Sequence, residues 1–173
     1  RARNGVTHRD AYAQAPNTAP AHTSVLSALY PSAHGVFNHG QTLDEDVVTM
    51  PEAFRDAGWA TAAFTQLNGP TYQQGFDHYV FLESPYDKGK GLGDLAPVIQ
   101  WVRERQGEPF FLFLHSYDVH LPYNPPQEYI DRWAPDYDGV LPPAIFRSQI
   151  DQINAGELEM TERDYQYILD LYD

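Results

Sequence analysis

Apolar residues fall along this chain in two kinds of pattern, uninterrupted runs and helical spacing. Two stretches predict buried strands: residues 59–64, in which Thr61 is the one polar residue, and residues 110–114, which are apolar throughout. The second run is typical of a central strand that is covered on both faces. A helix precedes each run in the predicted order, and this alternation indicates a parallel α/β sheet.

The first helical pattern follows a proline-rich approach. Val25, Leu26 and Leu29 share one helical face, which predicts a short buried helix over residues 21–29. Tyr30-Pro31 is expected to stop it, because proline lacks the N–H that a continuing helix requires. Residues 6–13 are predicted to form a short strand or extended segment that leads into this region, and residues 36–40 a loop.

Further helices are predicted downstream. Thr49 and Glu52 form a capping box, which predicts a helix that ends at Gly58. Four others follow from apolar spacing: one capped by Asp94 and ending at Gly107, with Val98, Ile99 and Val102 on one face; one over residues 127–134; one over 145–154; and one capped at 161–164, with Tyr165, Ile168, Leu169 and Tyr172 facing inward.

Composition narrows the class of protein. The 173 residues are 42% hydrophobic, which suits one globular domain with a core, and the formal net charge is −13. Nucleic acid and anionic membranes both need a basic surface, so neither is expected as a partner. The sequence has no cysteine and no apolar run of transmembrane length. The first residues look like the end of a helix and the last like the middle of one, so we expect an internal piece of a longer protein.

Thr18 is the first candidate for chemistry. It precedes the helix predicted over 21–29, where unpaired backbone N–H groups and the helix dipole favour an anion. A hydroxyl there, with His22 one turn later, suits attack on a phosphorus or sulfur ester. Threonine is also a common helix N-cap, so Thr18 could have only that structural role.

Two stretches carry a resemblance to a known family. Residues 18–22 read Thr-Ala-Pro-Ala-His, followed by Tyr30-Pro31 and His34-Gly35. This frame resembles the nucleophile segment of the sulfatase family, within the alkaline phosphatase superfamily, which reads Cys/Ser-x-Pro-x-Arg with the same continuation. Residues 115–126, His-Ser-Tyr-Asp-Val-His-Leu-Pro-Tyr-Asn-Pro-Pro, resemble a second motif of that family. The resemblance covers nearly the whole chain.

The chain departs from the family at chemically important positions. Thr18 cannot be oxidised to formylglycine, as the family's Cys or Ser is, and His22 replaces the family's arginine. Threonine with histidine four residues later resembles the nucleotide pyrophosphatase/phosphodiesterase branch, in which threonine itself attacks phosphorus. The lysine and histidine that follow the strand in sulfatases are absent after residues 59–64.

The resemblance implies an α/β, alkaline-phosphatase-like fold, with a largely parallel sheet and helices on both faces, incomplete at both ends. Residues 1–173 would then be part of a catalytic domain. It also implies a divalent cation (Ca, Zn or Mn) with Thr18 as one ligand and the other ligands mostly outside this chain. The acidic residues Asp44, Asp46, Asp136 and Asp138 match no motif and are expected at the solvated surface.

The resemblance assigns roles to five side chains. Thr18 would be the nucleophile, His22 would hold the nucleophile or the anion, and His120 would assist the leaving group. Asn38 would reach the bound anion, unless it simply occupies a turn. Asp118 would orient His120 or bind substrate or metal. For His120 the alternative is a buried, hydrogen-bonded histidine, and His115 is expected to be structural.

The function that the resemblance implies is metal-dependent hydrolysis of sulfate esters through residue 18. The Thr18 hydroxyl favours an alternative, hydrolysis of phosphodiesters or phosphonate monoesters. A second alternative is a catalytically inactive, sulfatase-like binding domain, which the departures favour. The partner in the first two cases is a small anionic ester. The family makes a periplasmic or extracellular location plausible, although the sequence does not establish one.

Overall fold

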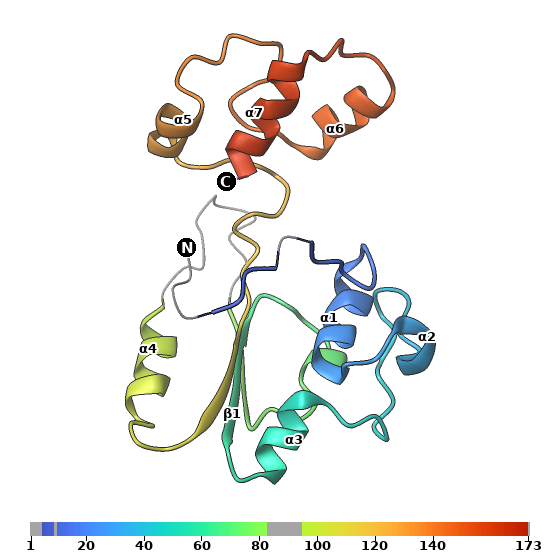
Figure 1. Cartoon of the computed structure of the whole chain (residues 1–173), viewed down its shortest axis with the longest axis vertical. Coiled ribbons are helices and arrows are strands. Elements are labelled where there is room, and N and C mark those ends of the chain that lie inside the picture. Colours follow the sequence, from blue (N-terminus) through green and yellow to red (C-terminus); the bar gives the residue numbers. More distant parts are fainter. Residues whose placement is uncertain (1–4, 9, 83–94, 173) are drawn as a thin grey trace. The chain divides into compact units, whose positions relative to one another are not determined.

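The computed structural model describes residues 5–8, 10–82 and 95–172 (Figure 1). The chain separates into two compact units. The first comprises Arg1–Phe81 and Ala96–His115, and the second comprises Leu82–Leu95 and Ser116–Asp173. No helix in the described ranges is long and apolar enough to cross a membrane.

A parallel sheet of three strands organises the first unit, in the order β2-β1-β3. Its strands are β1 (Ala60–Thr65), β2 (His78–Phe81) and β3 (Phe110–Leu114). The parallel α/β prediction is confirmed, but β1 and not β3 is central among the described strands. The sequence pattern missed β2, because this strand is short and half-exposed and only its pairing with β1 defines it.

Helices cover both faces of this sheet (Figure 1). Phe110 packs against Trp101 of α4 (Ala96–Arg103), with ring centroids 5.4 Å apart. Its neighbour Phe111 stacks on Phe54 of α3 (Met50–Asp56) at 4.7 Å. Successive side chains of a strand point to opposite faces, so α4 covers one face of β3 and α3 covers the other.

The capping box predicted for α3 is confirmed. The backbone N–H of Thr49 donates to Glu52 Oε2 at 2.8 Å, and the N–H of Glu52 donates to Thr49 Oγ1 at 3.4 Å. After the helix, Gly58 adopts a left-handed φ of +83°, which a residue with a side chain rarely does. Both ends of α3 are therefore set by local residues.

The first helix, α1, spans Thr18–Ser27 and not residues 21–29. It starts earlier because Pro20 lies in the first turn, where a missing N–H removes no helical hydrogen bond. It stops earlier because Ala28 takes a left-handed φ of 56°. The predicted apolar face is also wrong in part. Val25 and Leu29 are exposed, and the buried residues are Ala19, Pro20, Thr23, Ser24 and Leu26.

Three other predictions for the first unit need correction. Pro31 is not only a stop, since it begins the short helix α2 (Pro31–His34). Of the two forms predicted for residues 6–13, the strand is wrong, because residues 6–8 and 10–13 pair with no described strand and are exposed; the extended segment stays a prediction. In α4, Ile99 is exposed and Trp101 is buried in its place, against the rings of Phe64 and Phe110. The predicted cap Asp94 lies outside the described residues. The loop at 36–40 is confirmed.

The second unit is built around three helices, α5 (Gln127–Trp133), α6 (Arg147–Asn154) and α7 (Glu162–Tyr172). The predicted bounds of α5 and α6 are correct to within two residues at each end, and α7 begins within the cap predicted at residues 161–164. The face predicted for α7 is wrong, however, since Tyr165, Leu169 and Tyr172 are exposed. Its buried positions are Asp164, Tyr167 and Leu171, and Ile168 packs partly buried beside them.

A buried carboxylate explains the rotation of α7. Asp164 accepts hydrogen bonds from the Tyr137 hydroxyl, from the Val140 N–H, and from both the N–H and the hydroxyl of Thr161. The Thr161 hydroxyl and the other donors hold the pKa of Asp164 far below its ordinary value. Burial, followed by the bond to Asp164, raises the pKa of Tyr137 to about 12. Because Asp164 must face these donors, residues 167 and 171 face the core.

Candidate functional site

Thr18 is the first residue of α1, and Asn17 occupies the N-cap position. The structure therefore rules out the interpretation of Thr18 as the N-cap. The Thr18 side chain is half-buried, and within the described part of the chain its hydroxyl makes no hydrogen bond. The hydroxyl is thus available for chemistry at the start of a ten-residue helix.

The N-terminus of α1 has the electrostatics that an anion prefers. The first-turn N–H groups of a helix have no intrahelical partner, and Pro20 contributes none, so those of Thr18 and Ala19 remain. The N–H of Ala21 already donates to the Asn17 carbonyl at 3.1 Å. No acidic residue lies in this first turn. Nothing in α1 itself therefore opposes an anion near Thr18.

His22 is tied to the backbone of Thr18. Its Nδ1 lies 2.8 Å from the Thr18 carbonyl oxygen. A carbonyl only accepts hydrogen bonds, so Nδ1 must carry the hydrogen, and in the neutral ring Nε2 carries the lone pair. The imidazole of His22 and the backbone of Thr18, one helical turn apart in the sequence, are therefore in direct contact.

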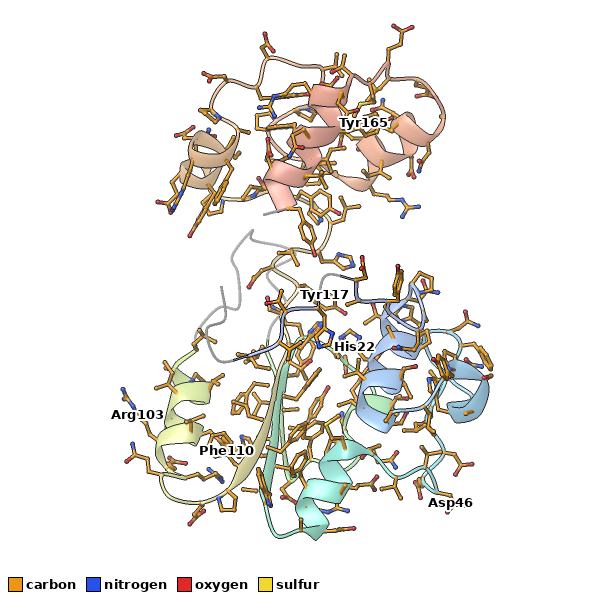
Figure 2. All side chains as sticks on the ribbon, viewed as in Figure 1. His22, Asp46, Arg103, Phe110, Tyr117 and Tyr165 are labelled. Atoms are coloured by element: carbon orange, nitrogen blue, oxygen red, sulfur yellow. The ribbon has the colours of Figure 1, made fainter. Side chains whose placement is uncertain are left out.

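Three aromatic rings contact the His22 ring. They belong to Tyr72, at 6.3 Å between centroids, Phe113, at 6.3 Å, and His115, at 4.9 Å. All three meet the imidazole edge to face. Figure 2 shows the His22 side chain between α1 and the sheet.

Sequence reasoning took His115 as structural and did not connect it with His22. The alternation of side chains along a strand could have predicted which face of the sheet His115 lies on. His115 follows β3 directly, so it shares a face with Phe111 and Phe113. That face is the one that α3 covers through Phe54, and α1 presents His22 to it.

Asn38 lies exposed in a turn of the first unit. The side-chain oxygen of Gln41 accepts from the N–H of Phe37 at 2.6 Å and from the N–H of Asn38 at 2.8 Å. These bonds agree with the alternative in which Asn38 simply occupies a turn. A contact between Asn38 and a bound anion stays a prediction.

Asp118 and His120 belong to the second unit. Both are exposed, so the alternative of a buried histidine is wrong for His120. His120 Nδ1 donates to the Leu121 carbonyl at 2.7 Å, and its ring meets Tyr117 edge to face at 5.1 Å. The N–H of Asp118 donates to the Ser116 hydroxyl at 2.9 Å. Their participation in one site with Thr18 stays a prediction.

A second histidine, His34 of α2, contacts α1 through Ser24 and has a structural role. Val36 donates its N–H to Nδ1 of buried His34 at 3.1 Å, so the hydrogen of this ring lies on Nε2, which donates to Ser24 Oγ at 3.0 Å. A histidine that donates to a serine cannot act as its base in this state. Burial also lowers the pKa of His34. The pair therefore joins α2 to α1 in place of forming a nucleophilic dyad.

The residues of the described ranges do not make up a metal site by themselves. No three histidine, cysteine, aspartate or glutamate side chains in these ranges lie close enough to share an ion. Asp44, Asp46, Asp136 and Asp138 are exposed, as expected. Thr18 offers a single oxygen, which is too few ligands for any divalent cation in a protein.

Solved structures define the class of fold as α/β and alkaline-phosphatase-like. The phosphonate monoester hydrolase of Agrobacterium radiobacter aligns with a TM-score of 0.63 and 18% identity, over 92% of this chain and 47% of that protein. A protein solved in complex with its substrate D-glucosamine-2-N,6-O-disulfate aligns with a TM-score of 0.58 and 19% identity, over 78% of this chain and 31% of that protein. The predicted fold class is thereby confirmed.

The family follows from the sequence comparison. The sulfatase family model matches residues 1–143, and the chain belongs to the sulfatase family. A curated relative, the N-acetylglucosamine-6-O-sulfatase of Bacteroides thetaiotaomicron, is 25% identical over 88 residues, which are 51% of this chain and 16% of the relative. The chain spans less than half the length of each of these relatives.

Proposed function

We propose that the protein hydrolyses sulfate esters, with Thr18 as the nucleophile. The observation that carries the proposal is the Thr18 hydroxyl at the N-terminus of α1, with His22 bonded to the Thr18 carbonyl at 2.8 Å, in a chain of the sulfatase family. The helix N-terminus supplies positive potential for the ester's anionic oxygens. We also propose that both units belong to one catalytic domain over residues 1–173.

The proposed chemistry has two steps. The Thr18 oxygen forms a bond to sulfur and releases its proton to solvent, while the bond from sulfur to the leaving alcohol oxygen breaks. That oxygen takes a proton, for which His120 is the proposed donor. Water then cleaves the ester on Thr18 and releases sulfate. His22 keeps the backbone of Thr18 in place during both steps.

A phosphodiester or phosphonate monoester is the second candidate substrate. Threonine cannot be converted to formylglycine, and its hydroxyl suits direct attack on phosphorus. The likeness to the phosphonate monoester hydrolase of Agrobacterium radiobacter supports this candidate, since it extends over 92% of the chain. The same two steps apply with phosphorus in place of sulfur. An inactive binding domain remains the third possibility, and complete absence of turnover would support it.

We further propose a divalent cation, Ca, Zn or Mn, with Thr18 as one ligand. The other ligands would come from outside the described residues, given the absence of an acidic or histidine cluster within them. When bound, such an ion lowers the pKa of a hydroxyl and neutralises the oxygens of the ester. Asn38 and Asp118 are proposed to contact the substrate. A periplasmic or extracellular location is proposed from the family alone.

The test uses the full-length protein on three nitrophenyl probes, namely the sulfate, the bis-phosphate diester and a phosphonate monoester. N-acetylglucosamine-6-sulfate is a further probe, chosen from the activity of the curated relative. Thr18→Ala should abolish turnover, whereas Thr18→Ser, which keeps a hydroxyl, should retain part of it. Sulfatase activity that survives Thr18→Ala refutes the nucleophile. Removal of divalent ions with a chelator, followed by return of each ion, tests the cation.

A further inference from the structure

His115 takes its position from the most deeply buried part of the first unit. Its backbone N–H donates at 3.0 Å to the carbonyl of Phe64, a residue of the central strand β1 that is only 1% exposed. This bond continues the ladder between β1 and β3 by one residue beyond Leu114. The sheet therefore holds the backbone of His115 as firmly as that of a strand residue.

The His115 ring lies nearer to His22 than the other rings do. The two centroids are 4.9 Å apart and the ring planes meet at 78°, whereas Tyr72 and Phe113 are each at 6.3 Å. Edge-to-face contact at this distance is a favourable and directional arrangement of aromatic rings. It restricts rotation of the His22 ring about its own side-chain bonds.

We infer that His115 is a positioning residue for His22. The sheet holds His115, the His115 ring holds the plane of the His22 imidazole, and this plane lets His22 Nδ1 donate to the Thr18 carbonyl at 2.8 Å. The first residue of α1 is thereby connected to the central strand through two histidines. The inference rests on the proposed function for its consequence in catalysis, although the geometry itself does not. His115 acts through His22 and is not assigned a contact with the substrate.

The His22–His115 contact should fix the position of one hydrogen atom on the His22 ring. Which nitrogen of a neutral histidine carries the hydrogen depends on the bond that the ring makes. His22 should therefore carry it on Nδ1 as long as its ring plane is held. When the ring can turn, the bond to the Thr18 carbonyl weakens and the hydrogen moves to Nε2 in part of the molecules.

Nitrogen NMR of histidine-labelled full-length protein at alkaline pH measures this directly, with the His22 signal assigned by its loss in His22→Gln. In the unaltered protein and in His115→Phe, which keeps an aromatic edge, Nδ1–H should dominate. In His115→Ala the share of Nδ1–H should fall at least about twofold. His78→Ala removes another histidine of the sheet, one that contacts Phe64 and not His22, and should change nothing. His115→Leu replaces His115→Ala if the latter does not fold.

An unchanged His22 tautomer in a folded His115→Ala or His115→Leu variant overturns the inference. So does an equal loss of Nδ1–H in His115→Phe, because that ring keeps the proposed contact. In kinetics, His115→Ala should lower kcat about tenfold or more, since small misplacements of reacting groups are costly, and His115→Phe should restore it. If Thr18→Ala stays active, the proposed function fails while the tautomer still tests His115. If Thr18→Ala is inactive and the tautomer is unchanged, only the present inference fails.

Discussion

Gly75 offers a sharp test of the packing that covers one face of the sheet. It has a left-handed φ of +86°, and a Cβ added to it would lie 2.6 Å from the backbone nitrogen of Glu52 and 2.9 Å from Thr49 Oγ1. These are atoms of the capping box that begins α3. The Gly75 carbonyl also accepts a hydrogen bond at 3.0 Å from the buried Thr61 hydroxyl of β1. Gly75 therefore cannot move away without loss of that bond.

The magnitude follows from comparison with a second glycine. Gly58 has nearly the same φ, +83°, but a Cβ there would meet nothing within 4 Å. Gly58→Ala should then lower the free energy of unfolding by about 1–2 kcal/mol, the cost of a left-handed residue. Gly75→Ala adds about 1–3 kcal/mol for overpacking and about 1 kcal/mol for the disturbed cap. The two alanine variants should therefore differ by about 2–4 kcal/mol.

The assay is urea unfolding of the full-length protein, with the midpoint and slope fitted for both variants. Hydrogen exchange at the N–H of Ala53, which donates to the Thr49 carbonyl at 3.0 Å, reports on the first turn of α3. That exchange should accelerate in Gly75→Ala more than in Gly58→Ala. Equal destabilisation by the two substitutions would refute the reasoning, because only the backbone conformation would then matter.

Three further predictions concern other contacts. Ala28 has a left-handed φ of 56°, so Ala28→Gly should raise the free energy of unfolding by about 1 kcal/mol. Urea unfolding measures this change, and a lower stability of the glycine variant would contradict the prediction. Burial lowers the pKa of His34, so the unfolded chain binds a proton at this histidine more tightly than the folded protein does. The free energy of unfolding should therefore be highest above a pH of about 6.5 and fall as the pH drops below that value. His34→Gln should remove that part of the pH dependence, and an unchanged slope would contradict the assignment. A Cβ at Gly139 would collide with the Asp164 carboxylate, so Gly139→Ala should lower the melting temperature of the second unit; an unaltered melting curve would show that the network yields.

Local signals in the sequence were sufficient where the partners of a group lie within one helical turn. The capping box of Thr49 and Glu52 is of this kind. The bond from His22 to the Thr18 carbonyl was not predicted, because the helix was expected to begin only at residue 21. The apolar run of β3 was also sufficient, because five aromatic and aliphatic residues after Gly107 and Pro109 are too few for a helix and suit a buried strand. The family motifs then identified the fold and the family correctly.

Tertiary contacts decided what apolar spacing alone could not. The α7 helix is rotated because the Asp164 carboxylate requires donors from Tyr137 and Val140, which lie more than twenty residues earlier. The α1 helix buries the polar residues Thr23 and Ser24 on its packed face, and Ser24 is hydrogen-bonded there to His34 of α2 at 3.0 Å. A hydrophobic pattern carries no information about such polar partners.

The candidate site divides in the same way. Thr18 and His22 could be paired from the sequence, because a helix places residues four apart on one face. The contact between His22 and His115 could not, because it joins residues 93 positions apart through the pairing of β3 with β1. The sequence predicted which side chains are candidates for chemistry. Only the sheet, by fixing which residues of β3 face α1, decided which of them meet.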